Sequence, residues 1–150
     1  MRRSVWTGES GVVLVLALIL LLVLTVNGIS AISTTTFETG LSGNDRAGTE
    51  AFYASEAVIQ IGIDQLPNVQ AIAQTRVGES SSGWSGWPED KAEPEEIKNL
   101  GGYPQAGYDV SAWGFTRYRV TGTGEASGAA KVIEVQVSHG PFPAGTQYNN

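Results

Sequence analysis

The chain has no cysteine and a single histidine among its 150 residues. The absence of cysteine excludes structural disulfides and thiolate metal sites. The chain has almost no side chains that could form a catalytic nucleophile–base pair. His139 is its only imidazole, and a solvated or packing role suits this residue better than catalysis. No glycine-rich phosphate loop occurs in the context that such a loop requires. We therefore expect a non-enzymatic protein with no catalytic residue, no cofactor and no metal site.

Positive charge is also scarce. Arg2, Arg3 and Glu9 precede Val12, and the rest of the chain carries 7 basic and 14 acidic side chains, a net charge of −7. Such an acidic body argues against nucleic acid or anionic lipid as a partner. The acidic group at 89–96 offers oxygen ligands for calcium but lacks the alternating ligand loop of an EF-hand, so a solvated surface is the simpler interpretation.

Residues 11–26 contain no charge, and no polar side chain before Thr25. If the apolar character continues through Ile29 and Ile32, the segment has the roughly 20 residues that an α-helix needs to span about 30 Å of hydrocarbon. A buried helix of a soluble domain would show periodic polar positions instead. The sequence therefore predicts one transmembrane helix at 12–32.

The charges that flank this helix predict its orientation. Arg2 and Arg3 precede it, and the next basic residue is Arg46. The positive-inside rule then keeps the N-terminus in the cytoplasm and sends the body outward. Three fates fit this layout. The helix is a permanent anchor, or a secretory signal cut near Gly28–Ser30, or a segment that is cut on its cytoplasmic side and stays on the mature protein.

A second helical pattern runs from Asp45 to Leu66, where Pro67 ends it. Its expected apolar face consists of Phe52, Ile59, Ile63 and Leu66, widened by Ala54, Val58 and Ile61. We expect one long, interrupted helix from about Val12 to Leu66, whose second half packs on the body. Ser42 and Asp45 have the spacing of a capping box, which predicts a fresh start near the interruption.

Three glycines weaken the long helix: Gly28, Gly40 and Gly43. Glycine costs about 1 kcal/mol in a helix interior relative to alanine. We therefore expect these positions to give the helix flexibility just where it leaves the apolar segment. The threonines at 34–36 still permit a helix, because their hydroxyls can bond to carbonyls of the preceding turn.

Beyond Pro67 the patterns are weaker. We expect a short helix at 68–77, a Gly/Ser-rich loop at 78–92 and another short helix at 94–99, with Pro94 in its first turn. A period of two then predicts strands at 116–121 and 133–138.

A glycine-rich connection, residues 122–130, is expected to join the two strands. Arg117 or Arg119 is expected to face Glu134 across the pair. Residues 140–150 are expected to form a tail.

A family resemblance rests on four groups of residues. They are the apolar run from Gly11 to Leu16, Thr34–Thr36, Gly43–Arg46 and, above all, the run from Ala51 to Ala57. The last run, Ala-Phe-Tyr-Ala-Ser-Glu-Ala, is similar to the Ala-Phe-x-Ala-Ala-Glu-Ala signature of PilX-type minor pilins, with Ser55 in place of an alanine. The resemblance covers roughly residues 8–66. It implies an assembly motif formed by Ala51, Phe52, Ala54, Glu56 and Ala57.

The resemblance also implies prepilin processing between Gly11 and Val12, which leaves the apolar helix on the mature protein. Cutting after Gly8 instead would place the charged Glu9 first. Most pilins have glutamate at the fifth mature position, whereas this chain has Leu16 there. PilX-type and tip-type pilins often lack that acid, so the departure favours a position at the end of a filament.

The expected fold class is α+β, pilin-like, with a long N-terminal transmembrane and amphipathic helix packed on a small antiparallel sheet. The expected divisions are a leader at 1–11, the transmembrane and filament-core helix at 12–32, its amphipathic continuation at 33–66 and a globular head at 67–150 with a C-terminal hairpin.

The implied function is that of a minor pilin of a type IV pilus that assists assembly or initiation, with a place at the tip. Its implied partners are the major pilin, other minor pilins, the prepilin peptidase, the inner-membrane assembly machinery and the membrane itself. The implied location is the inner membrane before assembly and the cell-surface pilus afterwards. Two alternatives stay open: a pseudopilin of a type II secretion system, and a secreted or membrane-anchored binding module.

Overall fold

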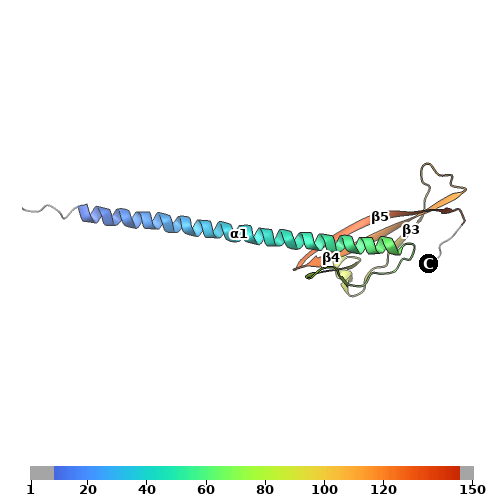
Figure 1. The fold of residues 1–150 in the computed structure, drawn as a ribbon, viewed down its shortest axis with the longest axis horizontal. Coiled ribbons are helices and arrows are strands. Elements are labelled where there is room, and N and C mark those ends of the chain that lie inside the picture. The colour runs from blue at the N-terminus through green and yellow to red at the C-terminus, as the bar shows by residue number, and fades with distance from the viewer. Residues whose placement is uncertain (1–8, 146–150) are drawn as a thin grey trace, which may run out of the picture. The chain divides into compact units, whose positions relative to one another are not determined.

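The computed structural model describes residues 9–145, with side chains from Gly11 onward. The expected leader begins with residues 1–8, which lie outside this range. Helix α1 (Glu9–Gln65) comes first. The elements that follow are β1 (Thr75–Arg76), β2 (Ser81–Ser85), the 3-10 helix η1 (Pro88–Lys91), β3 (Lys98–Gly102), β4 (Trp113–Ala126) and β5 (Ala129–Pro143) (Figure 1). The chain divides into two compact units, Met1–Gly43 and Asn44–Asn150, and the second is called the head below.

From Gly11 to Leu24, α1 is apolar on every side. By length and composition, Gly11–Gln65 is the one helix of the described residues that could cross a membrane, and its most apolar window has a mean hydropathy of 3.0. The hydroxyls of Thr34, Thr35 and Thr36 donate to backbone carbonyls four residues earlier, at 2.9 to 3.1 Å. These bonds satisfy the hydroxyls inside the helix, as the sequence predicted.

Helix α1 is continuous, so the expected interruption is wrong. Its 57 residues run from Glu9 to Gln65 without a break. Ser42 and Asp45 both lie within the helix, and no new helix starts between them. The three glycines cost helix propensity, but each costs only about 1 kcal/mol, which the surrounding helical turns outweigh. The expected end next to Pro67 is confirmed within one residue.

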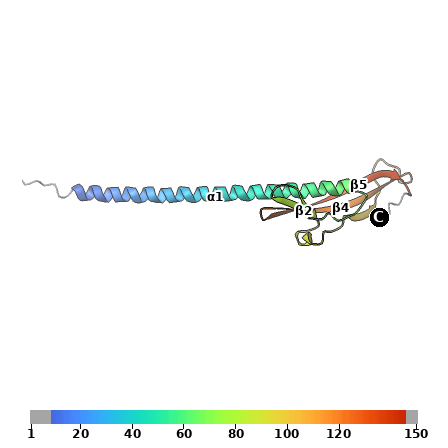
Figure 2. The same cartoon turned by 60° about the horizontal axis from the view of Figure 1, so that its bottom comes forward.

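The head is built on an antiparallel sheet with β4 at its centre. β5 pairs with β4 along nearly its whole length. On the other edge of β4, β3 pairs with residues 116–119 and β2 pairs with residues 122–126, while β1 pairs with β2. The C-terminal part of α1 lies along this sheet in both views (Figures 1 and 2). The expected α+β arrangement, a long helix packed on a small antiparallel sheet, is confirmed.

The core of the head forms where α1 meets the sheet. Its buried cluster consists of Ile59, Ile97, Tyr118 and Val120, and the half-buried side chains that pack on it are Ile63, Leu66, Val69, Ile133 and Val135. The expected contribution of Ile59, Ile63 and Leu66 is therefore confirmed. Phe52 was expected on the same face but is 43% exposed, because it lies on the flank of the helix.

Two expected elements between Pro67 and Lys91 are wrong. Residues 68–77 are extended rather than helical, because Ile72 enters the core and exchanges hydrogen bonds with Ser85 of β2. The expected loop at 78–92 contains β2, whose Trp84 is only 2% exposed. Glycine and serine suggested a loop, but Gly83 of β2 leaves room for α1, because a Cβ there would stand 2.5 Å from Val58.

The expected helix at 94–99 is also wrong. Ile97 is buried in the core, and the amide of Glu95 donates to the carbonyl of Ser85 at 3.0 Å. β3 begins directly afterwards at Lys98. Local helix signals of a six-residue segment are weak, and pairing with β4 together with the burial of Ile97 outweighs them.

The two predicted strands exist but are much longer than predicted. β4 has 14 residues and β5 has 15, so the expected connection at 122–130 and the start of the expected tail are both part of the hairpin. Only Ser127 and Gly128 form the turn, and both have positive φ, at 47° and 83°. This is the two-residue turn whose twist matches that of a hairpin. Arg119 faces Glu134 at 3.6 Å, as one of the two expected pairings.

Candidate assembly surface

The run from Ala51 to Ala57 lies on α1 where the helix crosses the sheet. Three of its side chains face the sheet and are fully buried: Ala51, Ala54 and Ser55. The hydroxyl of Ser55 donates to the carbonyl of Phe52 at 2.7 Å, so the polar group that replaces an alanine is satisfied within the helix. This half of the signature is therefore a packing surface.

Glycines of the sheet lie directly under these small side chains. A Cβ built on Gly124 would stand 2.1 Å from the Ala51 carbonyl oxygen and 2.4 Å from the Ser55 amide nitrogen. A Cβ on Gly83 would stand 2.5 Å from Val58. The backbones of helix and sheet thus approach one another as closely as glycine permits. This role was not predicted from the sequence, although glycines at alternate positions, 122 and 124, indicate a strand face with no side chains.

The other half of the signature faces away from the sheet. Phe52 is 43% exposed, Tyr53 is 62% exposed, and Glu56 is also exposed. The two aromatic rings meet edge to face, with centroids 6.0 Å apart. Large exposed aromatics on a helix flank contribute little to the core, so this half is a candidate contact surface.

A groove of about 590 Å³ lies between this flank of α1 and β5. Its lining residues are Phe52, Tyr53, Glu56, Ala57, Ile59, Gln60, Ile133 and Val135. The groove therefore joins three of the five residues of the expected assembly motif, Phe52, Glu56 and Ala57, to two residues of β5. These two residues, Ile133 and Val135, are half-buried, and they line the groove and also pack on the core cluster.

Near the start of the head, a polar contact joins α1 to the segment just before β2. Glu50 accepts a hydrogen bond from the Ser80 hydroxyl at 2.8 Å and pairs with Arg46 at 3.1 Å. These two partners lower the pKa of the Glu50 carboxyl below its usual value. On the sheet, burial raises the pKa of the Tyr118 hydroxyl, which belongs to the core. Neither shift indicates catalysis, because each has an ordinary structural cause.

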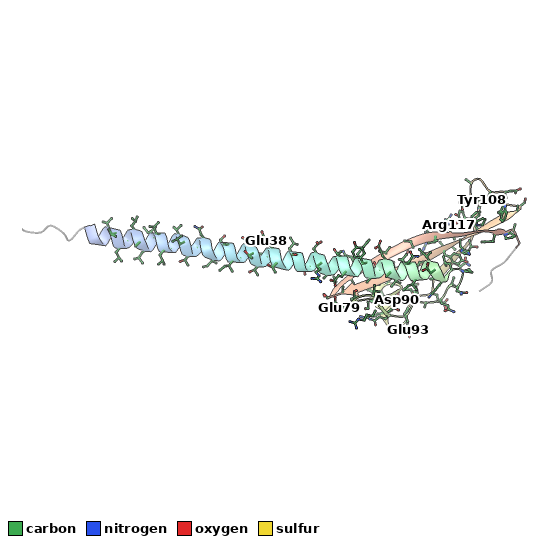
Figure 3. The ribbon with its side chains drawn as sticks, in the orientation of Figure 1. Glu38, Glu79, Asp90, Glu93, Tyr108 and Arg117 are labelled. Carbon is green, nitrogen blue, oxygen red and sulfur yellow. The ribbon has the colours of Figure 1, made fainter. Side chains whose placement is uncertain are left out.

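The acidic segment near η1 is engaged in local contacts. Asp90 accepts a hydrogen bond from the Trp87 amide at 2.7 Å, Glu95 pairs with Lys98 at 2.7 Å, and Lys91 pairs with Glu125. Figure 3 shows Asp90 and Glu93 on the rim of the head. Among the described residues no group of three or more His, Cys, Asp or Glu side chains is placed to hold a metal ion.

The remaining predicted site residues lie in the first unit, and none of them lines the groove. Gly11 and Val12 are in the first turns of α1, and Val12 is 70% exposed. Gly28, Gly40 and Gly43 are exposed, and a Cβ added at any of them would meet nothing within 4 Å. Packing within the described chain therefore does not require glycine at these positions.

The class of protein follows from the arrangement: a long apolar helix whose far part packs on a small antiparallel sheet, as in pilins. The family model described as PilX N-terminal matches residues 10–60, about a third of the chain. The match confirms the resemblance to PilX-type type IV pilins over that segment, which includes the whole Ala51–Ala57 signature. No curated protein and no solved structure matches the chain.

The match supports a minor pilin of a type IV pilus as the general function. This family is a structural one, and association with other pilins and with the pilus machinery fits it. The apolar N-terminal helix fits membrane anchoring followed by incorporation into a pilus.

Proposed function

We propose that this protein is a minor pilin that initiates or caps a type IV pilus. The observation that supports this most directly is the PilX N-terminal match, which spans both the apolar helix and the Ala51–Ala57 signature. Before assembly, the apolar part of α1 lies in the inner membrane with its N-terminus in the cytoplasm, because the basic residues Arg2 and Arg3 precede it. After assembly, the apolar part of α1 packs in the filament core and the head is displayed on the cell surface.

Processing by a prepilin peptidase is part of this proposal. It removes residues 1–11 and leaves Val12 as the N-terminal residue. Residues 12–32 then form the transmembrane and filament-core segment, 33–66 its amphipathic continuation and 67–150 the rest of the head. Gly28, Gly40 and Gly43 let the helix loosen as it leaves lipid, since glycine lowers the local stability of a helix.

The tip-proximal place follows from Leu16. After cleavage behind Gly11, Leu16 takes the fifth position, where the resemblance places glutamate in the major subunit. That acid neutralises the N-terminal amine of a neighbouring subunit, and a charge left unpaired in a dry filament core is costly. Glu9 belongs to the leader and Glu38 lies far along the helix, so neither replaces it. A subunit without the acid fits the end of a filament, next to the major pilin and other minor pilins.

The first prediction concerns the mature N-terminus. We expect the purified protein to begin with an N-methylated Val12, because the chain has a glycine just before the apolar helix. Intact-mass spectrometry measures this directly. A mass that corresponds to cleavage near Ser30 would indicate a secreted module, and an uncut chain would indicate a permanent anchor. Either result would contradict the pilin proposal.

A second prediction concerns copy number. If the protein initiates or caps filaments, deleting its gene reduces the number of pili per cell more than it alters their structure. Quantitative proteomics of sheared fibres should find it as a small fraction of the major subunit. If it makes up most of the fibre mass, the tip-proximal place is wrong, although the protein would remain a pilin.

A further inference from the structure

The outer edge of β5 is an unpaired strand edge. Among the described residues β5 pairs with β4 alone. Ala126 and Ala129 flank the two-residue turn, and in such a hairpin this pair exchanges both backbone hydrogen bonds. Hydrogen bonding to β4 then recurs at every second residue of β5, at the odd-numbered positions from Ala129 to His139. The even-numbered residues between them direct their backbone N–H and C=O groups away from the sheet.

Within the described head this edge carries the charged side chains Lys131 and Glu134, but it lacks the other usual protections. Natural sheets shield an edge with a short strand, charged side chains, a proline, a bulge or a covering element. β5 is 15 residues long, its register with β4 is regular from Thr116↔His139 to the turn, and Pro141 and Pro143 come only after that region. No hydrogen bond from elsewhere in the described chain reaches the backbone of Val132, Glu134 or Gln136.

The groove described above lies beside this same edge. Ile133 and Val135 face α1 and line the groove with Phe52 and Tyr53. A strand added to β5 would lie about 4.8 Å further out, with alternate side chains on the α1 side. Those side chains would enter the groove and cover the exposed aromatic rings. Backbone pairing and apolar burial would then act together, as in known cases of strand addition.

The charge of the groove indicates the chemistry of the incoming strand. Glu56 is the only charged residue that lines it, and its carboxylate has no hydrogen bond or ion pair within the described chain. Glu134, on the opposite face of β5, already has Arg119 as a partner at 3.6 Å. A basic side chain opposite Glu56 would therefore complement the groove.

A second copy of this chain does not fit the edge in its simplest geometry. Two β5 strands paired antiparallel would be related by a two-fold axis perpendicular to the sheet. The helical segments 44–65 of the two copies would then run in opposite directions, and the two chains would enter the pair from opposite sides. In the proposed filament, copies of one subunit would run in the same direction, which this pairing does not permit.

We propose that β5 and the groove beside it receive an extended strand from a different, neighbouring subunit of the filament. The strand has apolar side chains at every second position, which enter the groove, and a lysine or arginine opposite Glu56. Phe52 and Glu56, the outward residues of the signature, thereby acquire a function distinct from helix–sheet packing. The identity of the neighbour as a filament subunit rests on the proposed function. The unpaired edge of β5 is observed independently of that proposal.

The test uses the full-length protein in detergent micelles and two peptide probes. The first is a nine-residue peptide of alternating valine and threonine with one central lysine, and the second has glutamate in place of that lysine. Residue-resolved hydrogen exchange should show that the lysine peptide protects the amides of Val132, Glu134 and Gln136 by at least about tenfold. The amides of Ile133 and Val135 should change little, because they are already bonded to β4.

Several results would overturn the proposal. The even-numbered amides would be protected without peptide if another element covered the edge. Protection without peptide that increases with protein concentration would assign the edge to a second copy. A lysine peptide that protects none of these amides, or a glutamate peptide that protects them equally well, would contradict the backbone pairing or the role of Glu56.

Two variants with matched controls test the edge and the groove separately. Gln136→Pro removes an outward N–H without removing a bond to β4 and should abolish peptide protection, whereas Gln136→Thr should retain it. If the proline variant melts early, the test relies on Glu56→Lys, whose side chain is exposed. That variant should reverse the preference between the two peptides, and Glu89→Lys, outside the groove, should leave the preference unchanged.

Failure of this inference can be distinguished from failure of the proposed function. If the mature chain begins at Val12 but no peptide protects the edge, the protein is a pilin and the strand-addition site is wrong. If the peptide binds but the chain is not cut at Gly11, a filament subunit as the partner is wrong. In cells, Gln136→Pro should reduce piliation while leaving cleavage and protein level unchanged.

Discussion

Replacing Gly124 with alanine is expected to destabilise the head by about 3 kcal/mol or more, among the largest effects of any single methyl group in this protein. The added Cβ would stand 2.1 Å from the Ala51 carbonyl oxygen and 2.4 Å from the Ser55 amide nitrogen. Both atoms belong to the backbone of α1, so no side chain can rotate out of the way. The helix must move off the sheet, which opens the core around Val58 and Ile59.

The measurement is denaturant unfolding of the full chain in micelles, followed by tryptophan fluorescence. Trp84 is 2% exposed and reports on the head, whereas the long apolar helix would dominate a far-ultraviolet signal. The matched control is Gly48→Ala on α1, where the nearest atom to the new Cβ is a Lys131 side-chain carbon at 3.7 Å. That change should be neutral or stabilise by up to about 1 kcal/mol. Equal stabilities for the two variants would show that helix and sheet are not in close contact.

The same glycines show where sequence-based prediction reached its limit. The residues from Gly122 to Ala130 were interpreted as a connection, because glycine is usually a turn residue. In the head, Gly83, Gly122 and Gly124 are strand residues whose missing side chains make room for α1. Local propensity cannot reveal this, because the reason for each glycine lies on an element that is distant in the sequence.

The helix was predictable for the opposite reason. Its signals are local and repeated: an uncharged apolar segment, a second apolar stripe and Pro67 just after its end. The error was to treat weak helix formers near Gly43 as an interruption, although a helix that is already formed on both sides propagates through them at small cost. Short segments without such support, 68–77 and 94–99, were mispredicted as helices because pairing and burial determine their structure.

The signature run was found from the sequence, but its division into two faces was not. Ala51, Ala54 and Ser55 face the sheet, whereas Phe52 and Glu56 face the groove. A helical period places residues 52 and 59 on the same face, and the sequence does not show that the sheet buries Ile59 but leaves Phe52 43% exposed. Only the position of the glycine-lined strands identifies Ala51 and Ser55, rather than Phe52, as the packing face.

Replacing Gly11 with glutamate is expected to abolish processing while leaving membrane insertion intact. Under the proposed function, the peptidase acts between Gly11 and Val12 on the cytoplasmic side of the helix. A glutamate adds a charged side chain at the scissile position, and the apolar residues from Val12 onward, which drive insertion, are unchanged. The uncut protein should therefore accumulate in the membrane fraction at its full mass, and the cells should lose pili to the same extent as a gene deletion.

Gly8→Glu is the matched control for this experiment, because it places the same charge three residues earlier at the other candidate cleavage position. We expect this variant to be cut after Gly11 as usual, so intact mass and immunoblotting of membrane and sheared-fibre fractions should separate the two substitutions. If Gly8→Glu blocks processing and Gly11→Glu does not, cleavage occurs after Gly8. Leu16 would then not be the fifth mature residue, and the tip-proximal place inferred from it would lose its support. If neither substitution changes how the chain is processed, no leader is cut from the helix at these glycines. The helix is then an anchor or a signal.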